Sequence, residues 1–105
     1  MDDVHAELER EAARVTDRLR AMALDRLQRP DAEGRALEQR AHDAAQALAD
    51  LAADAVGRER RPVPVLATHG VADQVAVTAA DVMAEADEAR QRQALDVLVA
   101  LRHAL

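Results

Sequence analysis

The sequence of 105 residues contains no cysteine, phenylalanine, tyrosine, tryptophan or isoleucine. Without cysteine there is no disulfide framework, no thiolate zinc site and no cysteine nucleophile. A core must therefore be built from Leu, Val, Met and a large share of Ala, and each Ala buries little apolar surface. A small domain with such a thin core often needs a second copy of itself.

Lysine is also absent, and the acidic residues outnumber the arginines by 20 to 14, so that the net charge is −6. A negatively charged chain repels nucleic acid and anionic membrane surfaces, and this one has no aromatic side chain to stack on bases. The acidic start lacks a secretory signal, and no apolar run approaches the roughly 20 residues of a membrane span. We expect no nucleic-acid partner, no membrane partner and a cytoplasmic location.

Apolar residues recur at alternating steps of four and three along most of the chain, which is typical of helices packed on one face. This pattern predicts a single all-α domain over residues 1–105. We expect a first helix at about 3–28, a second at about 31–56 and a third from 65 or 71 to 105. The first helix should end before Pro30 and the second at Gly57, which offers a left-handed cap. The short connection between them predicts an antiparallel hairpin.

An extended linker at 58–64 should join the second and third helices, because Pro62 and Pro64 cannot continue a helix. The linker and the residues after it carry Val63, Val65 and Leu66. We expect these apolar side chains to lay the linker over the bundle rather than leave it in solvent.

The apolar stripe of the last third slips by one residue after Ala89 and resumes at Ala94. Such a slip rotates the stripe by about 100°. Either the helix breaks near 88–93 into a fourth helix, or it stays whole and its end needs a second partner. We favour a dimeric helical bundle, with a self-association interface at Leu95, Leu98, Val99, Leu101 and Leu105.

His42 lies in the middle of the second predicted helix, followed by Asp43-Ala44-Ala45-Gln46. This placement resembles histidine phosphotransfer domains, and the resemblance implies a phosphate-accepting role for His42. That family follows its histidine with a lysine and a glycine that expose the ring, whereas Asp43 would oppose an incoming phosphoryl group. The alternative is an exposed helix histidine that pairs with Glu38 at i−4.

Other polar groups also allow two interpretations. Asp43, Asp50 and Asp54 follow one side of the second helix, but no Glu-x-x-His motif accompanies them, which favours a solvated face over a metal site. Arg58, Arg60 and Arg61 either complement the negative end of that helix or dock an anion or a partner. The roles of His69 and of a polar band stay open; the band comprises Asp73, Gln74, Thr78 and Asp81.

Serine is absent as well, so no serine or cysteine nucleophile accompanies the histidines. We predict no catalytic residue, cofactor or metal. Three functions remain: a non-catalytic interaction or scaffold protein acting as a homodimer, a phosphotransfer module using His42, and a sensor of small apolar ligands with a cavity between Ala-rich helices. The first is favoured because it requires no motif that the sequence lacks.

Overall fold

The computed structural model describes residues 3–105, and within them it contains five α-helices and no β-strand. The helices are α1 (Val4–Ala21), α2 (Leu24–Gln28), α3 (Leu37–Ala55), α4 (Val71–Glu85) and α5 (Glu88–Ala104), with a 3₁₀ turn, η1 (Thr68–Gly70), before α4. The predicted all-α class is confirmed. No helix in the described part of the chain is long and apolar enough to cross a membrane.

The first predicted helix is two helices. α1 starts at a side-chain cap, where Asp3 Oδ1 accepts the Ala6 N–H at 2.8 Å. It ends at Ala21, and the chain resumes as α2 after the extended residues Met22 and Ala23. No proline or glycine marks this break. Tertiary packing overrides local helix propensity here, because the change of direction buries Leu27 in the core.

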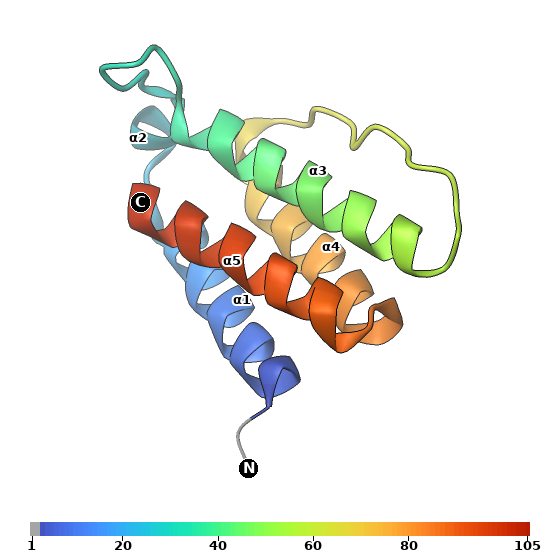
Figure 1. The fold of residues 1–105 in the computed structure, drawn as a ribbon. Coiled ribbons are helices and arrows are strands. Elements are labelled where there is room, and N and C mark those ends of the chain that lie inside the picture. The colour runs from blue at the N-terminus through green and yellow to red at the C-terminus, as the bar shows by residue number, and fades with distance from the viewer. Residues whose placement is uncertain (1–2) are drawn as a thin grey trace.

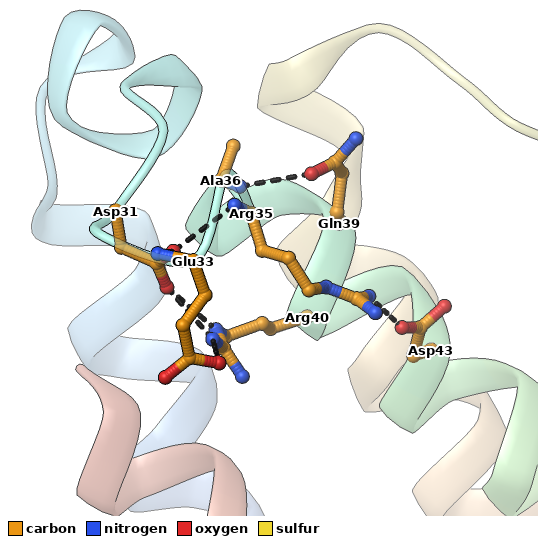
Figure 2. Close-up of polar contacts among 7 residues, drawn as sticks. All are labelled: Asp31, Glu33, Arg35, Ala36, Gln39, Arg40 and Asp43. Carbon is orange, nitrogen blue, oxygen red and sulfur yellow. Dashed lines mark hydrogen bonds and ion pairs between the residues drawn. The ribbon is translucent and has the colours of Figure 1, made fainter.

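α3 begins at Leu37 rather than near residue 31. The preceding residues form a turn around Asp31, whose Oδ1 accepts the N–H groups of Glu33 at 2.8 Å and Arg35 at 3.0 Å (Figure 2). Gly34 adopts a left-handed φ of 80°, which a glycine tolerates without steric cost. Asp31 therefore holds a non-helical turn where the sequence pattern predicts the opening of a helix.

The third predicted helix is interrupted, just before residues 88–93, where a break was one of the two alternatives. α4 ends at Glu85 and α5 starts at Glu88, where Asp87 Oδ1 caps the Arg90 N–H at 2.9 Å. Gln91 is buried and donates from Nε2 to the Ala86 carbonyl at 3.1 Å. The chain therefore turns back, and the break completes the fourth long helix of the bundle.

The four long helices, α1, α3, α4 and α5, pack around one core. Figure 1 shows that the linker after α3 runs back along α3 to the start of α4. α4 and α5 each contact both α1 and α3. The predicted hairpin is thus wrong in its packing: α1 and α3 face α4 and α5 rather than each other. The largest fully buried side chains come from all four helices: Leu8, Val15, Leu19, Leu48, Val75, Val82 and Leu98.

The expected self-association residues lie mostly inside this core. Leu98 is 0% exposed, Leu101 4% and Leu105 9%, while Leu95 and Val99 are half-buried. The prediction of an uncovered apolar tail is wrong, because α5 folds back between α1 and α3. Burial of these three leucines needs no second copy of the chain.

Polar contacts fix the end of α5 against α1 and α2. Buried Glu11 accepts a hydrogen bond from Arg102 Nε at 2.6 Å. The Leu105 carbonyl accepts from Arg18 Nη2 at 3.1 Å and from Arg26 Nη2 at 2.8 Å. α2 thus contributes to closing the bundle at this end.

Candidate functional site

The linker between α3 and η1 is extended, and side chains of the helices beneath hold it in place. Gln46 makes two contacts with the linker: its Oε1 accepts the Val63 N–H at 2.7 Å, and its Nε2 donates to the Arg61 carbonyl at 3.0 Å. Gln74 of α4 donates from Nε2 to the Pro64 carbonyl at 2.6 Å. The linker therefore follows one defined path across α3 and α4.

His42 belongs to the same set of contacts. Its Nε2 lies 2.9 Å from the Val63 carbonyl oxygen. Because a carbonyl oxygen only accepts, Nε2 must carry the hydrogen, and in a neutral ring only Nδ1 keeps a free lone pair. The ring is half-buried rather than exposed as the sequence suggested. The structure thus gives His42 a structural role beneath the linker.

A groove of about 690 Å³ opens between the end of the linker and the first half of α3. Its volume falls in the range of about 300–1,000 Å³ that is usual for ligand sites. The walls come from the turn before α3, from α3 itself, from the linker and from the start of α4. Among the lining residues are Arg35, Glu38, His42, Val65, Leu66 and Thr68.

The linker wall of this groove is apolar and uncovered. Val65 is 84% exposed and Leu66 is 56% exposed, although Leu66 lies near Gly70 of η1. Val63, two residues earlier, packs against the core. The expectation that all three apolar residues lie over the bundle is therefore wrong for Val65 and Leu66, which remain in solvent at the groove.

The α3 wall of the groove is charged. The Arg35 guanidinium is paired with the Asp43 carboxylate. Half-buried Glu38 accepts a hydrogen bond from Thr68 Oγ1, which itself accepts from Gln28 Nε2 at 3.0 Å. Within residues 3–105, Glu38 forms no ion pair. The groove therefore contains one carboxylate that is oriented by a hydroxyl and has no ion-pair partner among the described residues.

The turn at one end of the groove is held by charge. The backbone N–H of Arg35, followed by the side chain of Arg40, lowers the pKa of Asp31 to about 2. Arg40 Nη2 lies 2.7 Å from Asp31 Oδ2, and this contact raises the pKa of the guanidinium (Figure 2). Asp31 therefore stays ionised and fixes Gly34 and Arg35, which both line the groove.

The predicted arginine cluster lies at the other end of the linker and is largely neutralised. Arg58 Nη2 lies 3.2 Å from Glu85 Oε2, and Arg60 Nη2 lies 2.7 Å from Asp54 Oδ2. The bond to Arg60 lowers the pKa of Asp54. Arg61 uses its carbonyl to bind Gln46. Two of the three arginines thus serve contacts within the chain.

Residues of the acidic and polar bands make contacts within the chain. The part of the chain that the structure describes contains no group of three His, Asp or Glu side chains placed to hold a metal ion. Asp73 pairs with Arg20 of α1 at 3.0 Å, and Thr78 Oγ1 donates to the Gln74 carbonyl of its own helix at 2.8 Å. His69 is exposed in η1.

A second hollow runs between α3 and α5. It consists of two shallow grooves of about 340 and 270 Å³ that share Ala47 and Val97. Alanines of both helices supply four of the nine residues that line the larger one: Ala44, Ala47, Ala100 and Ala104. The small alanine side chains leave unfilled volume between α3 and α5 at these grooves.

Sequence reasoning named His42 but missed the groove beside it. The available signal was the pair Val65 and Leu66 after Pro64, together with Glu38 one helical turn before His42.

Comparison of the chain with protein-family models, with curated proteins and with solved structures finds no match.

Proposed function

We propose that the protein is a non-catalytic helical interaction module that binds a segment of another protein in the groove beside the linker. The observation that carries this proposal is the exposed pair Val65 and Leu66 on the groove wall, 84% and 56% exposed. Covering a Val or Leu side chain contributes about 1.5–3 kcal/mol each. Adjacent exposed apolar side chains with polar residues around them often mark a protein interaction site or a ligand groove.

The rest of the molecule supports this choice of surface. The bundle and the polar contacts under the linker fix the groove walls before any partner arrives, which lowers the entropic cost of binding. The apolar residues at the end of α5 no longer argue for a homodimer, since Leu98 and Leu101 are buried within the chain. Oligomeric state therefore becomes part of the test.

The test uses a double variant, Val65→Asp with Leu66→Asp, and a matched control, Val77→Asp. Val77 is 60% exposed on α4 and does not line the groove. Captured partners from the native cell are identified by crosslinking and mass spectrometry. We expect wild type and Val77→Asp to retain a partner that the double variant loses. Equal capture by all three folded proteins would refute the proposal.

The Ala-lined hollow between α3 and α5 supports a second candidate, a sensor of small apolar ligands. Its measurable sign is a rise in melting temperature with a panel of apolar compounds. Substituting Ala47, which both grooves share, by Leu fills the hollow and should abolish that rise. A rise that survives in Ala47→Leu would place the ligand elsewhere.

A further inference from the structure

We infer that the segment bound in the groove carries an arginine or lysine beside an apolar residue, with its cation paired to Glu38. This inference rests on the proposed function and names the chemistry of its partner. It follows from the charge that the groove leaves uncompensated and from the apolar wall opposite.

Glu38 selects the charge of the partner. It lines the groove, is half-buried, and has Thr68 Oγ1 as a hydrogen-bond donor but no cation within residues 3–105. Arg35, which also lines the groove, is already paired with Asp43. A partner that covered Glu38 without supplying a cation would leave an ionised carboxylate buried and unpaired, which is strongly unfavourable.

Val65 and Leu66 select the neighbouring residue. They lie on the linker wall, and Glu38 lies on the α3 wall of the same groove. A segment lying between these walls meets apolar surface on one side and a carboxylate on the other. The chain's net charge of −6 also favours encounter with a basic segment over an acidic one.

The experiment compares two capped peptides, glycine-leucine-arginine-leucine-glycine and the same peptide with glutamate in the centre. Each is titrated into the ¹⁵N-labelled protein while the amide signals of residues 34–43 and 65–74 are followed. We expect the arginine peptide to shift these signals saturably, with at least tenfold tighter binding than the glutamate peptide.

Two variants isolate the charge of Glu38. Glu38→Gln keeps an oxygen that accepts from Thr68 but removes the charge, and Glu59→Gln makes the same change in net charge at an exposed linker position outside the groove. We expect Glu38→Gln to weaken binding of the arginine peptide about tenfold, equivalent to about 1.4 kcal/mol. Glu59→Gln should leave it unchanged.

Several results would overturn the inference. Equal effects of the two Gln variants, equal binding of both peptides, or no shift in the groove with either peptide would each do so. Groove signals that change on dilution without peptide would show that a second copy occupies the site, which also overturns it. Binding that depends on Val65 and Leu66 but not on the charge of Glu38 would sink this inference and leave the proposed function standing.

Discussion

Among residues 3–105, Glu11 is the ionisable side chain that the fold buries most deeply, and its cationic partners decide whether this burial is tolerated. The residue is 7% exposed, Arg102 Nε donates to its Oε2 at 2.6 Å, and Arg14 Nη1 lies 3.8 Å from its Oε1. A buried carboxylate without a partner is strongly destabilising, whereas replacing both partners by apolar residues is often neutral. The pair joins α1 to α5, so its loss affects the closure of the bundle.

We predict that Arg102→Ala lowers the free energy of unfolding by about 2 kcal/mol, because the buried carboxylate loses its hydrogen-bond donor and keeps only the longer contact with Arg14. The control is Arg92→Ala, which removes an exposed i, i+4 pair with Glu88 and should cost less than about 1 kcal/mol. Urea denaturation measures both. The double variant Glu11→Leu with Arg102→Met should recover most of the loss; similar stabilities for the two single variants would contradict this assignment.

Asp31 makes the turn before α3 sensitive to acid. The pKa of Asp31 is lowered from 3.8 to about 2 in the folded chain. The ionised carboxylate therefore stabilises the folded state at pH values above the pKa that Asp31 has in the unfolded chain. This contribution is lost as pH falls from about 4 through about 2. We therefore expect Asp31→Asn to be less stable than wild type at about pH 6, with the difference vanishing near pH 2. Thermal unfolding across this range checks it, and a difference independent of pH would refute it.

At the scale of elements, the sequence predicts helices well and their interruptions unevenly. The phase slip after Ala89 left a break near 88–93 as one of two alternatives, and the structure has the break slightly earlier, at Ala86 and Asp87. The break at Met22 and Ala23 leaves no such mark, since it results from packing Leu27 into the core. The late start of α3 depends on Asp31, an acceptor that serves a turn as readily as a helix cap.

The groove was harder to foresee than the helices. Glu38 and Leu66 are distant in sequence and meet because the linker runs back along α3. The sequence pattern that drew attention to His42 lies on its own helix. Its hydrogen-bond partner is the backbone carbonyl of Val63, and every residue type has such a carbonyl, so the sequence does not mark it. Contacts of this kind depend on tertiary placement, which periodicity alone does not provide.

The linker depends on one amide side chain more than on any other. Gln46→Ala removes the bonds to the Val63 N–H and the Arg61 carbonyl, and we expect the linker to open locally while the helices stay folded. Hydrogen exchange at the Val63 N–H, which Gln46 Oε1 accepts, should accelerate about tenfold for each 1.4 kcal/mol lost. Gln93→Ala, on the exposed face of α5, is the control and should change nothing there. Unchanged exchange in both variants would show that His42 and Gln74 suffice.

At the scale of the whole molecule, the sequence predicts the all-α class because Ala, Leu and Arg favour helices and the apolar periods are regular. It does not predict the packing order. A short connection between two helical stretches normally makes them neighbours, but the turn at residues 29–36 and the long linker let α4 and α5 pack between α1 and α3.

We predict that Leu98→Asp unfolds the chain rather than dissociating an assembly. Leu98 is 0% exposed, and a charge there has no partner. Circular dichroism should show loss of helix to the same extent at low and high protein concentration. Leu24→Asp, at a residue 51% exposed, should remain folded. A folded monomer of Leu98→Asp would restore the tail as an interface.

Because α1 and α3 meet mainly through α4 and α5, the first half of the chain has no core of its own while it is being synthesised. Its Leu and Ala seams must wait for the last third to emerge from the ribosome, so folding proceeds late and in one cooperative step. A fragment of residues 3–57 should accordingly show little helix by circular dichroism, and adding a fragment of residues 58–105 should restore it. A stable helical first fragment would show that the two halves fold in sequence.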